Sequence, residues 1–178
     1  MAGLTRLMNE YNELHNNPLA EYGVSVGLYN ENDLYVWRCT IQGPKDTSFS
    51  GGLFTLKIIF PKEYPYKAPE VIFVTPIYHL NVHHVNHPDC PLGHVCMSTL
   101  NFWNSSTTMR EVLTKIYALF YLANKDSPFG IDRQAEMINN GQLYEEKVKY
   151  FTEKYANPSS EYYVDEQINN WDFSYPSK

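Results

Sequence analysis

Tyr78–Leu100, YHLNVHHVNHPDCPLGHVCMSTL, is the stretch on which our interpretation of the chain depends. An apolar run typical of a strand, Ile72-Phe73-Val74, precedes it, and Trp103 with an apolar helix follows it. The thiol of Cys96, near its end, therefore lies between two elements that we expect to be packed. Because thiolates are competent nucleophiles, we expect the chemistry of the protein here.

The composition favours one compact domain. The chain has 178 residues, of which 43% are hydrophobic and 15% aromatic, enough for a sizeable core. The formal net charge is −6 and Lys and Arg do not cluster, which argues against nucleic acid as a partner. No apolar run approaches the roughly 20 residues of a spanning helix, so we expect no membrane partner and a soluble protein of the cytoplasm, the nucleus or both. Cys39, Cys90 and Cys96 are an odd number without framework spacing, which favours reduced thiols.

The first half of the chain predicts a helix followed by an antiparallel sheet. Apolar residues recur at three- and four-residue spacing over residues 3–15, which is typical of an amphipathic helix. Turn residues separate four segments rich in β-branched and aromatic residues, Tyr22–Leu28, Leu34–Gln42, Gly52–Phe60 and Val71–Val74. We expect a four-stranded meander, in which a proline-rich crossing joins the third and fourth strands.

The second half predicts helices and a tail. Thr107 or Thr108 can cap a largely buried helix, and further helices are expected over Asp132–Asn139 and Gln142–Tyr155. The fold class is therefore α+β. Residues 157–178 are polar and acidic, and we expect a mostly flexible tail, although four aromatic residues can dock on the domain or on a partner: Tyr162, Tyr163, Trp171 and Phe173.

The order of these features resembles that of the ubiquitin-conjugating enzymes over Leu4–Ala156. The markers, weak one by one but specific in their order and spacing, are Gly43-Pro44, Gly51-Gly52, Phe60-Pro61, Tyr64-Pro65, Pro69, Tyr78-His79-Leu80-Asn81, Gly93–Cys96, Trp103, Asp126-Ser127-Pro128 and Tyr144–Ala156. The resemblance implies the fold of that family, an N-terminal helix, a four-stranded antiparallel meander and C-terminal helices. It makes residues 1–156 the catalytic domain and residues 157–178 a C-terminal tail.

The resemblance also implies an acyl transferase in which Cys96 carries ubiquitin, or a ubiquitin-like modifier, as a thioester. The modifier then passes to a lysine or to the thiol of a ligase, with no bound cofactor, since only the activating enzyme needs ATP. Asn81 aligns with the asparagine of the family's His-Pro-Asn signature, where its amide donates to the developing oxyanion or braces the loop. His79 is expected to fix the loop through backbone hydrogen bonds.

Two further residues are candidates for handling the incoming lysine. Ser127 aligns with the family's Asp-or-Ser gate beside the thiol, although it can equally belong to a simple turn. A serine there keeps a hydrogen bond but supplies no charge. His83 lies two residues after Asn81, where a neutral imidazole can assist deprotonation; the alternative is a solvent-facing loop histidine.

Two departures from the family pattern lie in the same stretch. Leu80 stands where the family usually has proline, which would hold the loop more rigidly. The segment after it is longer than in simple members and contains His83, His84, His87, Cys90 and His94. Imidazole and thiolate are the ligands that zinc prefers, so a metal-binding loop is an alternative. The spacing fits no standard structural zinc site, and we assign no metal.

The resemblance assigns partner surfaces as well. Arg6 on the first helix is the candidate contact for the activating enzyme, and Tyr66 and Ser105 lie in two loops that contact the ligase in the family. The expected partners are ubiquitin or a relative, an activating enzyme, a ligase and a substrate protein. A non-catalytic scaffold with the same fold, which binds ubiquitin or another partner, is the alternative function.

Overall fold

An antiparallel sheet forms the centre of the computed structural model, which describes residues 2–85, 90–95, 103–126, 128–166 and 168–176. Its strands pair in chain order: β1 (Val24–Leu28), β2 (Val36–Gln42), β3 (Leu53–Ile59), β4 (Glu70–Phe73) and β5 (His94–Val95). The four strands of the predicted meander are confirmed. The fifth was not predicted, because two residues are too few to show the alternation of a strand in the sequence.

Gly93 lets β5 approach β4. Its φ is +83°, a conformation that favours glycine, and a Cβ at this position would lie 2.0 Å from the carbonyl oxygen of Phe73. The amide of Phe73 donates to the Gly93 carbonyl at 2.8 Å. Only glycine at this position lets the chain enter β5, the two-residue strand that directly precedes Cys96 in the sequence.

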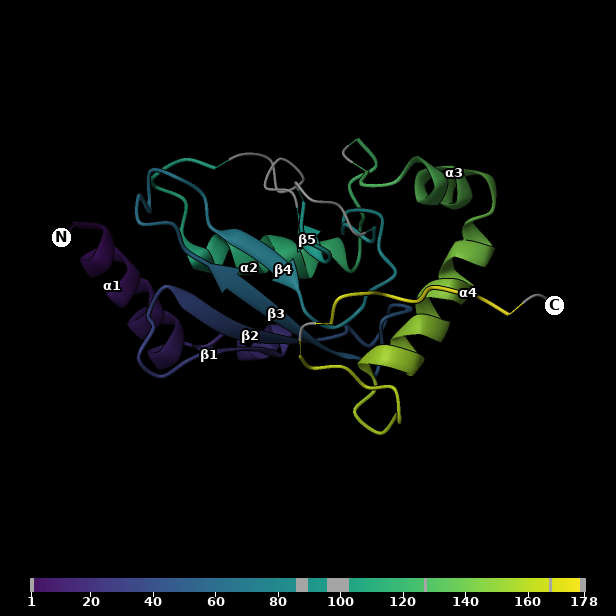
Figure 1. Ribbon diagram of the computed structural model, residues 1–178, viewed down its shortest axis with the longest axis horizontal. Coiled ribbons are helices and arrows are strands. Elements are labelled where there is room, and N and C mark those ends of the chain that lie inside the picture. The colour runs from purple at the N-terminus through teal and green to yellow at the C-terminus, as the bar shows by residue number, and fades with distance from the viewer. Residues whose placement is uncertain (1, 86–89, 96–102, 127, 167, 177–178) are drawn as a thin grey trace.

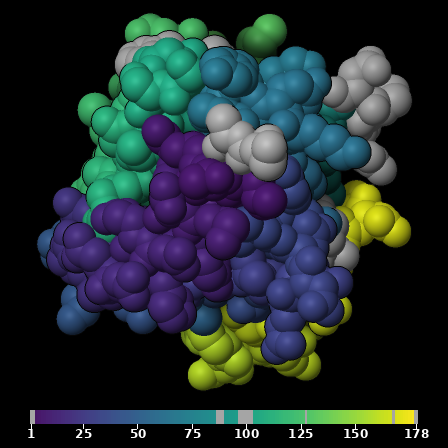
Figure 2. Space-filling model, turned by 90° about the vertical axis from the view of Figure 1, so that its left-hand side faces the viewer, coloured from purple at the N-terminus to yellow at the C-terminus, as the bar shows by residue number. Residues whose placement is uncertain are grey.

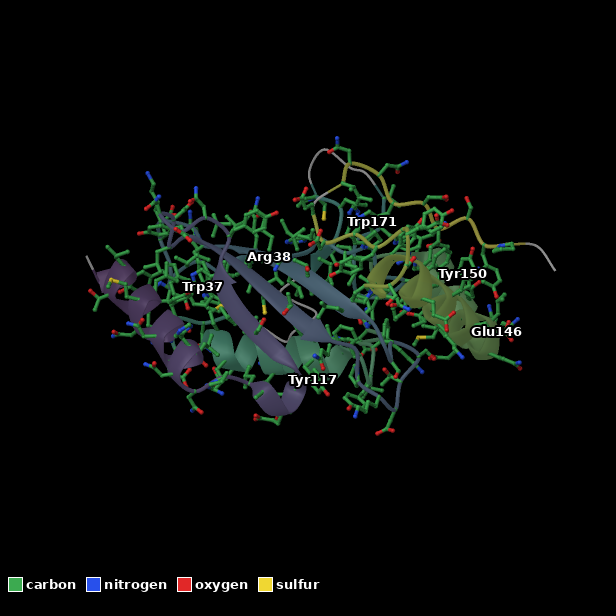
Figure 3. The ribbon with its side chains drawn as sticks, turned by 90° about the horizontal axis from the view of Figure 1, so that it is seen from below. Trp37, Arg38, Tyr117, Glu146, Tyr150 and Trp171 are labelled. Carbon is green, nitrogen blue, oxygen red and sulfur yellow. The ribbon has the colours of Figure 1, made fainter. Side chains whose placement is uncertain are left out.

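The strands divide their side chains between two faces of the sheet. Trp37, Cys39 and Ile41 of β2 are fully buried, whereas Arg38 between them lies on the outer face. Helix α2 (Met109–Leu119) covers the buried face, and Thr108 begins it with a capping box, as one of the two predicted caps. Tyr117 on α2 and Trp171 on the C-terminal tail lie on opposite sides of the sheet (Figure 3).

Helices close the two ends of the molecule (Figure 1). Helix α1 (Ala2–Asn16) lies at one end, and the short η1 (Ala20–Tyr22) leads from it to the sheet. Figure 2 views this end, with the purple residues of α1 in front. At the other end are α3 (Ile131–Asn139), α4 (Gly141–Phe151) and the π-helical turn η3 (Thr152–Ala156). Within the described ranges, no helix has the length and apolar character needed to cross a membrane.

The C-terminal tail returns to the domain. The amide of Val164 donates to the carbonyl of Tyr155 at 3.0 Å, and the hydroxyl of Thr75 donates to the carbonyl of Val164 at 2.8 Å. Trp171 is 6% exposed, and Phe173 packs edge-to-face on Phe151 of α4. The structure thus places at least these two tail aromatics against the domain, which was one of the two positions expected for the four of them.

Candidate active site

The turn Tyr78–Asn81 is held by hydrogen bonds from several other parts of the fold. His79 is 3% exposed, and its Nδ1 accepts from the amide of Asn81 at 3.0 Å. The proton of the neutral ring is therefore on Nε2, which donates to the carbonyl of Leu119 at the end of α2 at 3.0 Å. His79 thus makes hydrogen bonds with two backbone groups, one in its own turn and one at the end of α2.

The charge state of His79 follows from its surroundings. Burial, together with the nearby charge of Arg133, lowers its pKa from the ordinary 6.5 to about 4. The ring is therefore neutral at physiological pH and stays an acceptor for the Asn81 amide. A buried, neutral imidazole with both nitrogens engaged is suited to fixing a loop and not to accepting a proton from a substrate.

Asn81 is fully buried, and its side chain is clamped on one backbone residue. Its Nδ2 donates to the carbonyl of Asn124 at 2.7 Å, and its Oδ1 accepts from the amide of Asn124 at 2.8 Å. This pair of bonds joins the turn to the segment that follows α2. Bracing the loop was one of the two roles expected for Asn81; donation to an oxyanion stays a prediction.

Leu80, the residue that replaces the family proline, makes a hydrogen bond that proline cannot make. Its side chain is fully buried, and its amide donates to the hydroxyl of Tyr144 on α4 at 3.0 Å. Burial raises the pKa of Tyr144 to about 12, so the hydroxyl is neutral and available as an acceptor. The turn is therefore fixed at Leu80 by packing and by one buried hydrogen bond, in place of a constrained ring.

Cys96 and Ser127 lie outside the described residues, and so does His87. What the structure describes are the anchors on either side of Cys96. Val95 is fully buried and pairs with Val71 of β4, and on the other side the indole of Trp103 donates to the carbonyl of Pro65 at 2.8 Å. Both ends of the segment that contains Cys96 are thus attached to the core.

The backbone of His83 is hydrogen-bonded to that of His94, a residue of β5. The amide of His83 donates to the carbonyl of His94 at 3.0 Å, and the His83 ring packs against Phe129 with ring centroids 5.3 Å apart. The thiol of Cys90 lies 3.6 Å from Nδ1 of His94. Among the described residues, no three His, Cys, Asp or Glu side chains gather in a way that could hold a metal ion.

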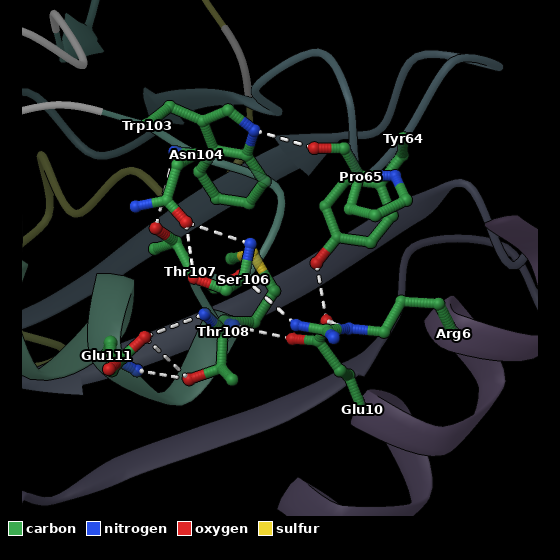
Figure 4. A network of polar contacts seen from close by, with 11 residues as sticks. Arg6, Glu10, Tyr64, Pro65, Trp103, Asn104, Ser106, Thr107, Thr108 and Glu111 are labelled. Atoms are coloured by element: carbon green, nitrogen blue, oxygen red, sulfur yellow. Dashed lines mark hydrogen bonds and ion pairs between the residues drawn. The ribbon is translucent and has the colours of Figure 1, made fainter.

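Arg6, the expected contact for the activating enzyme, takes part in a network inside the fold (Figure 4). Its guanidinium pairs with Glu10, one turn further along α1, and donates to the carbonyl of Thr107 at 3.3 Å. Glu10 is 8% exposed and also accepts from the Tyr64 hydroxyl at 2.6 Å and from the Met109 amide at 2.6 Å. The network therefore attaches α1 to the first turn of α2, where the helix dipole favours a carboxylate.

The two loops assigned to the ligase lie side by side. Tyr66 is 80% exposed, and Ser105 is exposed in the loop after Trp103. The hydrogen bond from the Trp103 indole to Pro65 joins the two loops directly. The structure thus brings both candidate residues to neighbouring parts of one surface.

Four residues of these networks were not given a role from the sequence: Glu10, Asn124, Arg133 and Tyr144. The role of Glu10 could have been predicted, because it lies three residues after Leu7 and four before Leu14, on the apolar face of the helix. A carboxylate on a buried face must find hydrogen-bond partners. No sequence pattern marks Asn124 or Arg133, whose contacts are made with residues far away along the chain.

Comparison with known proteins agrees with this arrangement. The family model described as "Ubiquitin-conjugating enzyme" matches residues 6–152. A protein of African swine fever virus named "Ubiquitin-conjugating enzyme E2" is 36% identical over 135 residues, which are 71% of this chain and 57% of the viral protein. The Arabidopsis thaliana protein "Probable ubiquitin-conjugating enzyme E2 31" is 34% identical over 134 residues, 75% of this chain and 82% of the plant protein. The match thus spans little more than half of the viral relative. The chain belongs to the ubiquitin-conjugating enzyme family.

Proposed function

We propose that the protein carries ubiquitin, or a ubiquitin-like modifier, as a thioester on Cys96 and passes it to a lysine or to the thiol of a ligase. The observation that supports this most is the clamped turn of His79–Asn81, within a family match that runs through Cys96. A turn whose amides and side chains are fixed by the core is suited to orienting a reacting group, because little reorganisation is needed during the reaction.

The chemistry suits a cysteine. The Cys96 thiolate attacks the thioester carbonyl that links the modifier to the activating enzyme, and the activating enzyme's thiolate leaves. In the second step an amine or a ligase thiolate attacks the new thioester. The Cys96 thiolate is then the leaving group, and an attacking amine gives up a proton. ATP is consumed only by the activating enzyme, so this chain needs no cofactor of its own.

We assign Asn81 a place in the transfer step, as the brace of the loop and as a donor to the oxyanion. Ser127 is the proposed gate, and His83 is a candidate for assisting the deprotonation of the lysine. A serine brings no negative charge to attract the lysine ammonium or to accept its proton. Transfer to a ligase thiol does not require that activation of an amine, so it suits this site better than transfer to lysine.

The proposed partner surface for the ligase is formed by Tyr66 and Ser105. An exposed aromatic ring next to a polar loop is typical of a residue that contributes strongly to binding. Arg6 contacts the activating enzyme only through the exposed part of its side chain, because its guanidinium is already engaged by Glu10. We place the activity in the cytoplasm, the nucleus or both.

The first test is thioester formation. The purified protein is incubated with ATP and matched pairs of activating enzyme and modifier, for ubiquitin and for the NEDD8 and SUMO types, and analysed on non-reducing gels. We expect a reducible adduct with one pair, absent in Cys96→Ala and stable to reductant as an ester in Cys96→Ser. Cys90→Ser is the matched control and should charge normally. No adduct with any pair, in folded protein, would favour the non-catalytic scaffold.

The second test identifies the acceptor. The charged protein is separated from ATP and exposed to free lysine or free cysteine at equal concentration. Faster discharge to cysteine supports transfer to a ligase thiol, whereas rapid discharge to lysine shows that the site activates an amine without a carboxylate gate.

A further inference from the structure

Arg133 on α3 is a buried cation that forms no ion pair among the described residues, although Asp132 and Glu136 are near enough to favour its charge. It is 2% exposed, and burial lowers its pKa to about 10. In the part of the chain that the structure describes, no carboxylate forms an ion pair with it: the adjacent Asp132 pairs with His84, and Glu136 pairs with Lys147. A charge in such a place must be stabilised by other groups, since desolvating it is costly.

Two aromatic rings and one carbonyl stabilise it. The guanidinium carbon lies 4.1 Å from the ring centroid of Tyr78 and 4.7 Å from that of Phe173, which places the cation against both rings. Its Nη1 donates to the carbonyl of His79 at 3.1 Å. Arg133 thus joins α3 to two segments far apart in the chain, the turn before Asn81 and the C-terminal tail.

The carbonyl of His79 is one of a small set of polar groups that fix the turn. The Leu80 amide is held by Tyr144, the Asn81 amide by the His79 ring, and the Asn81 side chain by Asn124. The contact with Arg133 fixes the carbonyl that precedes these groups. The same positive charge disfavours protonation of the His79 ring, which keeps Nδ1 available as the acceptor for the Asn81 amide.

We propose that Arg133 is a positioning residue for the turn that carries Asn81, and that Phe173 of the C-terminal tail holds Arg133 in place. The tail is then a working part of the active site although it lies beyond the residues matched by the family model. Removing Arg133 takes away one of the two hydrogen bonds to the carbonyl of His79 and leaves only the one from the Val82 amide at 3.3 Å. Removing Phe173 weakens the same contact by taking away one of the rings that hold Arg133. Either change loosens the turn that carries Asn81. This inference rests on the proposed function for its effect on transfer, but not for its effect on the turn.

Amide hydrogen exchange of the full chain measures the turn without any activity. In Arg133→Met, which keeps much of the bulk without the charge, we expect the Asn81 amide to exchange about tenfold faster, the loss expected from one charged hydrogen bond. Arg133→Lys keeps a cation near both rings and should recover part of the protection. Phe173→Ala should act in the same direction by about threefold, since cation–π contacts are worth less than such a bond. Tyr162→Ala, a tail residue that is 54% exposed, is the control and should leave exchange unchanged.

Transfer is measured separately from charging, with ubiquitin as the modifier. We expect Arg133→Met and Phe173→Ala to form the thioester to the wild-type extent and to discharge it to lysine more slowly, by about tenfold and threefold. A merely structural role would reduce charging and discharge together, in proportion to the folded fraction.

The two proposals fail in different ways. If the wild type forms no thioester with ubiquitin or with a NEDD8- or SUMO-type modifier, the proposed function fails, and Asn81 exchange still decides the role of Arg133. Should Arg133→Met not fold, Phe173→Ala decides, because it changes the support of Arg133 without removing the buried charge. Wild-type exchange at Asn81 in the folded variants would overturn the proposal.

Discussion

The hydrogen bond between the Leu80 amide and the Tyr144 hydroxyl gives the sharpest prediction about the turn. In Tyr144→Phe the ring stays and only the hydroxyl is lost, so the buried Leu80 amide at 3.0 Å loses its acceptor. Both residues are almost fully buried, at 0% and 3% exposed, so water cannot easily replace the hydroxyl. Leaving one buried donor unpaired costs about 1–3 kcal/mol, and we expect a loss of about 2 kcal/mol in the free energy of unfolding.

A double-mutant cycle isolates this one bond. Leu80→Pro restores the family residue and removes the amide hydrogen, so adding Tyr144→Phe in that background should cost less than about 0.5 kcal/mol. The difference between the two backgrounds is the coupling energy, expected at about 1.5 kcal/mol or more. The cost of replacing the buried leucine side chain cancels in the cycle.

Urea unfolding of the four proteins, followed by tryptophan fluorescence, measures these free energies. Tyr150→Phe is the matched control, because its hydroxyl, also on α4, makes no hydrogen bond among the described residues. It should change stability by less than about 0.5 kcal/mol. Equal costs of Tyr144→Phe in the leucine and proline backgrounds would refute the argument that this bond replaces the rigidity of proline.

Three other outcomes follow from the same structure. Glu10→Gln should lower the free energy of unfolding by about 2–3 kcal/mol, because it removes a buried carboxylate that accepts three different donors. The Glu13 side chain is 47% exposed, so the control Glu13→Gln should cost less than about 1 kcal/mol in the same urea titration. Burial depresses the pKa of His79 from 6.5 to about 4, so the unfolded chain binds this proton first as the pH falls. The contribution of His79 to stability is complete above about pH 6.5 and falls by up to roughly 3 kcal/mol as the pH drops to about 4; His79→Gln should flatten that part of the curve of unfolding free energy against pH, and an unchanged slope would contradict this. Tyr66→Ala should leave the melting temperature and thioester formation unchanged but weaken ligase-dependent transfer severalfold; an unchanged ligase rate would remove Tyr66 from the proposed surface.

Much of the fold could be predicted from local pattern. The amphipathic spacing of residues 3–15 predicted α1, and the β-branched and aromatic residues of Leu34–Gln42 predicted β2. Thr108 caps α2 as one of the two threonines expected. β5 was missed because it has only two residues, and it exists because Gly93 lets the backbone approach β4.

For the candidate site, the sequence determined the residues and the tertiary structure determined their contacts. The sequence by itself determined the residue types in the turn, the thiol at Cys96 and the family, because these depend on order and spacing along the chain. It could not determine which groups would hold the turn, since the partners of Leu80 and Asn81 lie 64 and 43 residues away.

Only the tertiary structure decided the roles of Arg6, Arg133 and the tail. Arg6, a surface cation by sequence, pairs with the buried Glu10, whose carboxylate in turn contacts a backbone amide 99 residues away. Arg133, on a helix whose other residues are exposed or half-buried, is buried between Tyr78 and Phe173. A local pattern records the preference of each residue for water or for the core. Whether a charge is buried, and what then stabilises it, depends on which distant groups the fold brings within a few ångströms.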